Sequence, residues 1–443
     1  MNLHKSHEIP GLVLAAPASN SGKTIVTMGL LRHLQRLGIV TAPFKAGPDY
    51  IDSAFHSAAA NYNCMNLDTW AMRENTIDSW VGQTCNDAAL IIGEGVMGLF
   101  DGTISDSGST ADIAAYLNLP VILVINVRGQ GASVAALVQG FSNFRKDITI
   151  AGVILNRVAS SRHEKLLRKA LTKINVPVLG AIPENDLLTI PSRHLGLIQA
   201  SETASLGSFL DKIADLVSET VDIKALIQRA RPIKLPSPQA NIPIILKPLG
   251  KHIAIAEDQA FSFKYNAILD GWKKSGAVLS KFSPLANEAP CDKADSVYLP
   301  GGYPELYAKT LSSNQTFIHG LQKAAQNNKW IYGECGGYMV LGKGLIDKEG
   351  CQHDMAGLLP LVTSFAQPKR NLGYREVSTL SKTPFAKIGT HFRGHEFHYA
   401  SIAHYDNTQP LYSCKDGNGE IIGNLGSAIK TVIGSFVHLI DRC

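Results

Sequence analysis

The chain has 443 residues, of which 45% are hydrophobic and 18% are charged, so it is too long for one core and too apolar for a disordered protein. Its net charge of +5 is spread without a long basic block, which argues against a nucleic-acid partner and favours a small anionic substrate. Seven scattered cysteines without a CxxC pair are typical of a reducing cytoplasm. No apolar run reaches the roughly 18 residues that span a bilayer. We therefore expect a cytoplasmic protein with no membrane partner.

In chain order, the first half alternates short apolar runs with helical patterns. Residues 11–16 (GLVLAA) predict a buried strand, and residues 23–37 predict a helix that stops at Gly38. Further strands are predicted at residues 39–44, 88–92, 121–125, 150–155 and 178–182, with helices at 110–117 and 162–174. This alternation indicates an α/β fold in which helices cover both faces of a mostly parallel sheet.

The turn after the first strand has the composition of a phosphate-binding loop. Ser21, Gly22, Lys23 and Thr24 supply backbone amides, an ammonium group for the β- and γ-phosphates of ATP, and a hydroxyl group for Mg²⁺. Pro17 stands where the usual pattern has its first glycine, so a strict pattern search would miss this loop. Its position between a strand and a helix favours an ATP site over a chance match.

Two other loops at the same expected sheet edge carry carboxylates, in the sequences KAGPDYID and EGVMGLFDG. Because ligands bind where the carboxyl ends of parallel strands meet, we expect these side chains near the phosphate loop. A helix cap or a solvated loop residue is the alternative for any one acid, but several acids at one edge favour a site. A plain turn explains Asn156 equally well. We assign Thr24, Asp49 and Glu94 to Mg²⁺, Lys45 and Asn156 to ATP, and Asp52 and Asp101 to the substrate.

The composition changes after residue 226. Residues 231–249 contain five prolines and little periodicity, which predicts a linker. A new α/β pattern follows, with a strand at 252–257, a helix around 260–274 and a strand at 296–299. We therefore divide the chain into an ATP-binding domain (1–228), a proline-rich linker (229–250) and a second domain (251–443).

The second domain contains a cysteine at a sharp predicted turn, in the sequence WIYGECGGYMVL (330–341). Cys335 follows an apolar strand and precedes two glycines, which allow the chain to turn sharply and hold the side chain in a strained pose. A helix that begins there would point N–H groups at the sulfur and stabilise a thiolate. A buried structural cysteine is the alternative. The flanking pattern favours a nucleophile.

A cysteine nucleophile needs a base and an oxyanion hole. Among fourteen histidines, His438 in GSFVHLID is predicted to end the last apolar strand, beside the expected position of Cys335. The turn LPGGYPE would bring the amides of Gly301 and Gly302 to the thiol. The amide of Gly336, which directly follows Cys335, is the third candidate donor. The alternatives are a structural histidine and an ordinary glycine turn.

Three further histidines, His391, His395 and His398, occur in HFRGHEFHY. Their spacing matches neither H-E-x-x-H nor a zinc finger. Alternating positions in a strand explain them at least as well, so we assign no metal to them.

Together these segments resemble the a,c-diamide synthases of corrin-ring biosynthesis, which are glutamine-dependent ATP ligases of the cobalamin pathway. The resemblance spans nearly the whole chain and rests on the segments SGKTIVTMGLLRHL, KAGPDYID, NLDTWAM, EGVMGLFDG, GSTADIAAYL, PSRHLGL, YLPGGYPELYA, GECGGYMVLG and RGHEFHY, which occur in the family's order. It implies an N-terminal P-loop domain of the dethiobiotin-synthetase type, followed by a class I glutamine amidotransferase domain.

The resemblance also implies a division of chemistry. In the C-terminal domain Cys335 attacks the side-chain amide of glutamine with the help of His438, and ammonia leaves. In the N-terminal domain ATP activates a carboxylate that the ammonia converts to an amide. Many relatives complete a triad with a glutamate two positions after the histidine, where this chain has Ile440. A Cys–His dyad is therefore implied, with Asp441 as a weak candidate for orienting the histidine.

The substrate is expected to be a corrin-ring acid with many carboxylates, for which Arg193 and His194 are candidate contacts. The segments NLDTWAM, GECGGYMVLGKGL and NLGYREV favour metal-free hydrogenobyrinic acid over cobyrinic acid, the first alternative. Cobyric acid synthase is a more distant alternative for the identity of the enzyme family. A partition-type P-loop ATPase switch is the remaining alternative, but residues 17–21 lack the additional lysine of such switches, and a switch has no use for Cys335. The sequence leaves open whether the protein is a homodimer.

Overall fold

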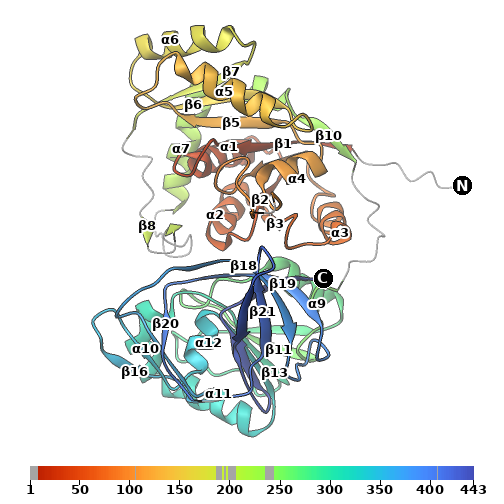
Figure 1. The fold of residues 1–443 in the computed structure, drawn as a ribbon, viewed down its shortest axis with the longest axis vertical. Coiled ribbons are helices and arrows are strands. Elements are labelled where there is room, and N and C mark those ends of the chain that lie inside the picture. Colours follow the sequence, from red (N-terminus) through yellow and green to blue (C-terminus); the bar gives the residue numbers. More distant parts are fainter. Residues whose placement is uncertain are drawn as a thin grey trace, which may run out of the picture. The chain divides into compact units, whose positions relative to one another are not determined.

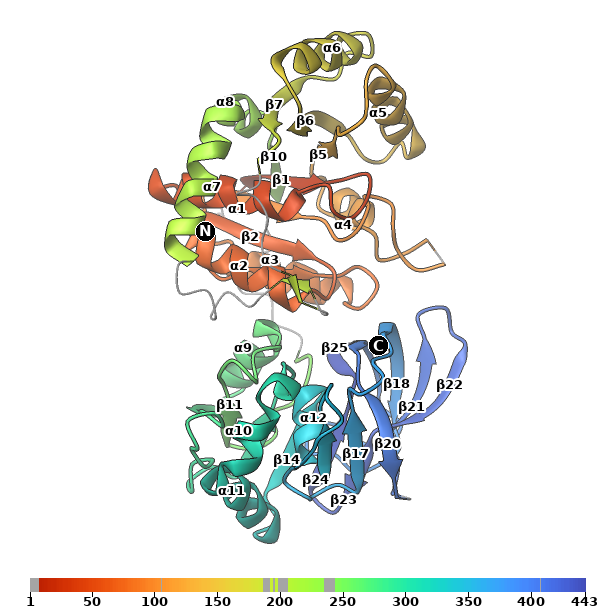
Figure 2. The same ribbon diagram turned by 90° about the vertical axis from the view of Figure 1, so that its left-hand side faces the viewer.

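The computed structural model describes residues 8–104, 106–185, 192–193, 196–197, 206–234, 244–406 and 408–443. The chain forms two compact units, which are described separately below (Figures 1 and 2). Apart from two short pieces, the first unit runs to residue 241 and the second begins at residue 242. Both pieces, Ala71–Arg73 and Arg193–Gly196, belong to the second unit.

An eight-stranded sheet forms the centre of the first unit (Figure 1). Seven strands pair in parallel in the order β3-β2-β4-β1-β5-β6-β7, and β10 pairs antiparallel with β1. The strands are β1 (Glu8–Ala15), β2 (Thr41–Ala46), β3 (Met65–Leu67), β4 (Leu90–Glu94), β5 (Val121–Asn126), β6 (Ile150–Val158), β7 (Val178–Pro183) and β10 (Arg231–Lys234). The predicted strands of this half, and the parallel sheet they were expected to form, are therefore confirmed.

Helices cover both faces of this sheet. Figure 1 shows α1 (Lys23–Arg36), α2 (Tyr50–Ala60) and α7 (Leu206–Thr220) on one face, and α3 (Glu74–Thr84) and α4 (Thr110–Tyr116) on the other. The chain also forms α5 (Ser133–Phe144), α6 (Ser161–Thr172), α8 (Ile223–Ile227), and the short paired strands β8 (Ser192–Arg193) and β9 (Gly196–Leu197). Since parallel strands are joined by crossover helices, all strands of this sheet up to β7 end at the same edge, where the phosphate loop begins.

The second unit is built on a six-stranded sheet in the order β12-β11-β13-β14-β24-β23, in which only β23 is antiparallel to its neighbour. These strands are β11 (His252–Ala256), β12 (Val278–Phe282), β13 (Ser296–Leu299), β14 (Trp330–Glu334), β23 (Ser427–Ile429) and β24 (Val432–Ser435). The helices of this unit are α9 (Asn266–Lys274), α10 (Ala308–Ser313), α11 (Gln315–Gln326) and α12 (Gly336–Leu341), with a 3₁₀ turn at Pro304–Tyr307.

Two smaller sheets complete the second unit, and the sequence did not predict them. A mixed sheet has the order β16-β15-β17-β20, and an antiparallel sheet has the order β22-β21-β18-β19-β25, part of which Figure 2 shows side by side. Their strands are β15 (Gly344–Ile346), β16 (Gln352–Asp354), β17 (Leu361–Ser364), β18 (Asn371–Thr379), β19 (His391–His398), β20 (Ser401–Tyr405), β21 (Tyr412–Asp416), β22 (Ile421–Leu425) and β25 (His438–Arg442).

Two expectations about local structure need correction. The helix predicted around 260–274 begins only at Asn266, because Phe263 exchanges backbone hydrogen bonds with Gly301 at 2.9 and 3.2 Å and is held in an extended conformation. The predicted linker begins with β10, which belongs to the sheet of the first unit. The domain boundaries themselves stay a prediction. In the part of the chain that the structure describes, no helix is both long and apolar enough to cross a bilayer.

Candidate active sites

The phosphate loop leads directly into α1, which begins at Lys23. The first N–H groups of this helix have no partner within the helix, so they point into the loop and can bind an anion. Gly22 has a φ of 93°, and a Cβ at this position would lie 2.1 Å from the side-chain nitrogen of Asn156. Asn156 Nδ2 also donates a hydrogen bond to the carbonyl of Ser21 at 2.9 Å. Asn156, which was predicted to contact ATP, thus packs against the phosphate loop.

Lys23 points from this loop toward EGVMGLFDG. Its Nζ donates to the carbonyl oxygen of Met97 at 2.6 Å. Burial lowers the pKa of Lys23, while the nearby Glu94 carboxylate acts in the opposite direction. In the same loop, Asp101 Oδ2 accepts a hydrogen bond from the amide of Gly98 at 2.7 Å. Asp101, assigned to the substrate, therefore also fixes the turn that provides the contact for Lys23.

Four of the predicted side chains meet at the carboxyl edge of the sheet: those of Thr24, Lys45, Asp52 and Glu94. Thr24 Oγ1 donates to Glu94 Oε1 at 2.8 Å and lies 3.3 Å from Asp52 Oδ2. Lys45 Nζ lies 2.5 Å from Asp52 Oδ2 and 2.9 Å from Glu94 Oε1. Burial alone would raise the pKa of Glu94, but the charges of Lys45 and His56 outweigh it and hold this pKa well below its usual range.

These oxygen atoms fit a Mg²⁺ ion, because hydroxyl and carboxylate groups are the ligands that this hard cation prefers. Lys45 provides the positive charge between the two acids in the structure. Burial would lower the pKa of Lys45, but Asp52 and Glu94 outweigh it and raise this pKa above its usual value. The convergence that the sequence predicted at this edge is therefore present, although Asp52 contacts Thr24 more directly than Asp49 does.

Asp49 is the N-cap of α2. Its Oδ1 accepts hydrogen bonds from the amides of Ile51 at 2.9 Å and Asp52 at 3.0 Å, and its Oδ2 lies 4.0 Å from Lys45 Nζ. Capping of this kind satisfies amides at the start of a helix. Its assignment to Mg²⁺ stays a prediction, and so does the assignment of the pair 193–194 to the substrate. Arg193 is the last residue of β8, and His194 lies outside the described residues.

His56 was not predicted as part of this site. It is completely buried, and its Nε2 makes a very short contact with Glu94 Oε2. His56 therefore fixes the carboxylate oxygen that faces away from Thr24. Sequence patterns offer little sign of this role, because His56 comes four residues after the end of the segment KAGPDYID, where a histidine is usually just part of a helix.

The strand–turn–helix predicted around Cys335 is confirmed. β14 ends at Glu334 and α12 begins at Gly336, so Cys335 alone forms the turn, with a φ of 47° and a ψ of −104°. A positive φ is strained in a residue other than glycine, and such strain is common at functional sites. A Cβ on Gly337 would lie 2.0 Å from the carbonyl oxygen of Leu299, so the chain needs glycine there for the close approach of α12 to β13.

The Cys335 side chain is buried, with 1% of the residue exposed. Burial raises the pKa of its thiol, and the charges of Glu305 and Glu396 act in the same direction, while the amide of Gly336 opposes them. The amide at the helix start therefore acts in the predicted direction, but burial outweighs it and the net shift of the pKa is upward. The hydrogen bond from one amide of a six-residue helix lowers the pKa of the thiol less than the loss of water around the sulfur raises it.

His438 lies beside this turn but begins β25 instead of ending a strand, which corrects the prediction. β24 ends at Ser435, and the chain then crosses from the parallel sheet into the antiparallel one. A Cβ added to Gly301 would lie 2.5 Å from His438 Cε1, 2.9 Å from His438 Nε2 and 3.3 Å from Cys335 Cβ. The structure thus brings the predicted cysteine, histidine and glycine turn together.

The three glycines predicted for the oxyanion hole differ in their amides. The Gly301 amide donates to the carbonyl of Phe263 at 3.2 Å, so it is engaged within the protein. The Gly302 nitrogen lies 3.0 Å from the position a Cβ on Gly336 would take, and the Gly336 amide contacts the thiol. A Cβ on Gly302 itself would lie 2.0 Å from the carbonyl of Ala260. The Gly336 amide therefore contacts the thiol, and the Gly302 nitrogen lies beside the start of α12, which keeps it as the second predicted oxyanion donor.

Glu334 was missed by the sequence analysis. It is 1% exposed, and its Oε2 lies 3.4 Å from His438 Nδ1. Asp441, the candidate considered from the sequence, instead binds the guanidinium of Arg73 at 2.7 Å within the same unit. The absence of an acid at Ile440 is the signal that could have prompted a search for another carboxylate.

The strand β19 contains His391, His395 and His398, as alternation suggested. Alternation places the first two on one face and His398 on the other. His398 Nε2 lies 2.8 Å from Glu396 Oε1, and Glu396 Oε2 accepts from Arg375 Nε at 2.6 Å. The three imidazoles therefore do not converge on one point of this strand.

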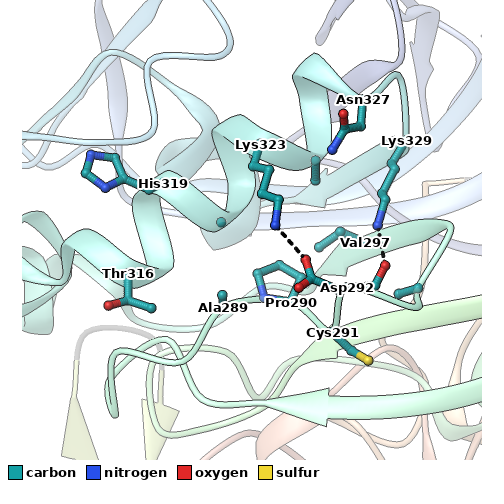
Figure 3. Close-up of a pocket in the computed structure, with 13 residues that line it drawn as sticks. Ala289, Pro290, Cys291, Asp292, Val297, Thr316, His319, Lys323, Asn327 and Lys329 are labelled. Atoms are coloured by element: carbon teal, nitrogen blue, oxygen red, sulfur yellow. Dashed lines mark hydrogen bonds and ion pairs between the residues drawn. The ribbon is translucent and has the colours of Figure 1, made fainter.

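A cavity of about 380 Å³ lies elsewhere in the second unit (Figure 3). Lys323 and Lys329 point into it toward Asp292, with which they make contacts of 3.0 Å to a carboxylate oxygen and 2.9 Å to the carbonyl oxygen (Figure 3). Its lining includes none of the predicted site residues. Both lysines are paired within the protein. Because none of the predicted site residues lines it, this cavity is separate from the cysteine site.

Two family models match the two halves of the chain. Residues 12–198 match the CobQ/CobB/MinD/ParA nucleotide binding domain, and residues 252–442 match the CobB/CobQ-like glutamine amidotransferase domain. Together with the phosphate loop and the cysteine–histidine site, these matches define a two-part enzyme: a nucleotide-binding unit joined to a glutamine amidotransferase. The predicted fold class is confirmed in both halves.

Relatives match nearly the full chain. The chain is 50% identical over 435 residues to hydrogenobyrinate a,c-diamide synthase of Brucella anthropi, covering 98% of this chain and 99% of the relative. It is 51% identical over 432 residues to the enzyme of that name from Brucella abortus (97% and 98% covered), and 48% identical over 431 residues to that of Rhizobium meliloti (97% and 99% covered). The chain belongs to the hydrogenobyrinate a,c-diamide synthase family.

Proposed function

We propose that this protein is an ATP-dependent ligase that amidates the a and c carboxylates of hydrogenobyrinic acid, with glutamine or free ammonia as the nitrogen source, in cobalamin biosynthesis. The observation that carries the proposal is the near full-length identity of about half the residues to relatives that bear this name. The separate nucleotide and cysteine sites support it, because the reaction needs both an activated acid and a source of ammonia.

In the second unit, Cys335 is proposed as the nucleophile and His438 as its base. The thiol sulfur forms a bond to the amide carbon of glutamine while its proton passes to the imidazole. The amides of Gly302 and Gly336 then stabilise the oxyanion. The imidazolium returns the proton to the leaving ammonia, and water hydrolyses the thioester to glutamate. Because burial raises the pKa of Cys335, this proton transfer has to accompany the attack.

In the first unit, the phosphate loop is proposed to bind ATP, with Lys23 at the β- and γ-phosphates. Transfer of the γ-phosphoryl group to a substrate carboxylate releases ADP and gives an acyl phosphate, which ammonia converts to an amide with release of phosphate. Mg²⁺ would be held by Thr24, Glu94 and Asp52, and when bound it would neutralise part of the negative charge of the phosphates. Lys45 contacts both acids, so when ATP binds its ammonium group can leave one carboxylate and bind a phosphate oxygen instead.

The choice of corrinoid is tested by supplying it directly. Purified protein is incubated with ATP, Mg²⁺ and glutamine, in parallel with hydrogenobyrinic acid and cobyrinic acid, and the amides are counted by mass spectrometry. We expect conversion of hydrogenobyrinic acid to the diamide at the higher kcat/KM. Preference for cobyrinic acid would support the alternative substrate, and consumption of neither ATP nor glutamine with either acid would refute the proposal.

The cellular setting is part of the proposal. The seven cysteines all lie in described residues and are free thiols, in keeping with the reducing cytoplasm expected from their spacing. Sedimentation of the purified protein is the direct measurement of whether it forms a homodimer.

A further inference from the structure

A buried carboxylate faces the imidazole of His438. Glu334 Oε2 lies 3.4 Å from His438 Nδ1, with the two side chains 2% and 1% exposed. The other ring nitrogen, Nε2, lies 2.9 Å from the position that a Cβ on Gly301 would take, and Cys335 Cβ lies 3.3 Å from the same position. The carboxylate therefore lies at Nδ1, and the other ring nitrogen lies on the side of the Gly301 turn, next to which Cys335 is placed.

The strand that carries the nucleophile also carries this carboxylate. Glu334 is the last residue of β14 and immediately precedes Cys335. Side chains alternate along a strand, so Glu334 shares the sheet face of Tyr332, whereas Gly333 faces α12, where a Cβ would lie 2.7 Å from Leu341. The turn at Cys335 thus fixes the thiol and the carboxylate relative to each other through the backbone.

Three donors hold the Glu334 carboxylate. Tyr298 Oη donates to Oε2 and Tyr332 Oη donates to Oε1, each at 2.7 Å, and the amide of Leu439 lies 3.4 Å from Oε1. Burial, strengthened by the charge of Glu334, raises the pKa of both tyrosines well above its usual value. Both phenols therefore keep their protons at neutral pH and orient the carboxylate toward the imidazole.

The other ionisable neighbours of His438 do not supply this contact. Asp441, on the same strand, accepts three hydrogen bonds from the amide and guanidinium of Arg73 at 2.7 to 3.1 Å. His395 is the cross-strand partner of His438. Burial, together with the charge of His438, lowers the pKa of His395 to about 3, so this ring stays neutral. Ile440 is a buried aliphatic residue.

We infer that Glu334 is the positioning residue of the glutaminase site: it accepts the Nδ1–H of His438 and leaves Nε2 to receive the thiol proton. This inference rests on the proposed function. During the reaction the proton passes from sulfur to Nε2 as the S–C bond forms, and from Nε2 to ammonia as the C–N bond breaks. Glu334 exchanges no proton. It stabilises the imidazolium that exists between the two steps.

The test is Glu334→Gln, which keeps the shape of the side chain and an oxygen acceptor but removes the charge. We expect kcat for glutamine hydrolysis to fall by about 100-fold or more, with KM for glutamine changed by less than about threefold, because the lost interaction exists mainly in the transition state. Synthesis with ammonium chloride should equal that of the wild type. Asp441→Asn is the matched control and should keep its kcat.

A double-mutant cycle separates positioning from a structural effect. If Glu334 acts through His438, adding Glu334→Gln to His438→Ala should change the residual rate by less than about twofold. Should Glu334→Gln fail to fold, Tyr298→Phe, which removes the donor to Oε2, should lower kcat by about 3- to 10-fold.

The inference is overturned if folded Glu334→Gln hydrolyses glutamine like the wild type, if the two variants of the cycle act independently, or if Asp441→Asn shows the larger loss. Unchanged glutamine hydrolysis by Tyr298→Phe, with Glu334→Gln unfolded, would also overturn it. Failure of the wild type itself to hydrolyse glutamine would instead refute the proposed function, so the two failures are distinguishable.

Discussion

Replacing Gly301 by alanine tests whether the glycine turn keeps the thiol and the imidazole in reacting positions. The added Cβ would lie 2.5 Å from His438 Cε1 and 3.3 Å from Cys335 Cβ. Since carbon atoms in ordinary contact are about 3.5 to 4.0 Å apart, the ring has to move by about 1 Å. A displacement of this size costs about 100-fold in rate, or about 2.7 kcal/mol of barrier. We therefore expect Gly301→Ala to lose about 100-fold in kcat for glutamine hydrolysis.

The assay compares two nitrogen sources on the same preparation. Amide formation from hydrogenobyrinic acid is measured with glutamine and with ammonium chloride, and only the first rate should fall, because the phosphate loop lies in the other unit. Gly271→Ala is the matched control, since a Cβ on this residue of α9 meets nothing within 4 Å. A Gly301→Ala variant within about threefold of wild type in glutamine hydrolysis would refute the reasoning, as would equal loss with both donors.

Three further predictions concern residues of the two sites. Cys335→Ser should lower glutamine hydrolysis by about 10³-fold or more because the hydroxyl is a poor nucleophile, while ammonia-dependent synthesis persists; loss of both would contradict separate sites. Lys23→Ala should abolish synthesis with either nitrogen source and leave glutamine hydrolysis measurable by glutamate release, and full synthesis by this variant would exclude the phosphate-site assignment. Glu94→Gln should raise the Mg²⁺ concentration needed for half-maximal ATP consumption by about 10-fold or more, and an unchanged Mg²⁺ titration would remove Glu94 from the metal site.

The parallel strands were predictable because both of their faces are buried. Residues of β5 such as Val121 and Ile122 are completely inaccessible, so the strand appears in the sequence as an unbroken apolar run. β18 reads NLGYREVST, and most of its residues are only partly buried. A strand of this kind gives a weak apolar pattern, and its place depends on β19 and β21, which follow later in the chain. The antiparallel sheet that carries His438 was therefore not predicted.

The site residues divide in a similar way. Lys23, Thr24 and Cys335 were predictable because a local sequence pattern carries their chemistry. The role of Glu334 was not predictable, because an acidic residue after an apolar run usually marks only the point where a strand ends. Its role depends on the two tyrosines and on a histidine more than 100 positions later, which only the packed sheets bring together.

Both sites keep their charged groups compensated in the free protein, and this explains why neither displays its reactive form. Lys45 lies between Asp52 and Glu94, so it compensates the buried carboxylate of Glu94 and the partly buried carboxylate of Asp52; two acids this close without its charge would be a costly arrangement in a protein interior. A Mg²⁺–nucleotide complex has to replace part of this pairing in order to bind. The thiol of Cys335 is neutral for the same reason, because burial penalises an uncompensated anion. The carboxylate of Glu334 compensates the imidazolium, not the thiolate. Charge separation at the second site therefore becomes favourable only when bound glutamine accepts the electron pair of the sulfur as the proton leaves.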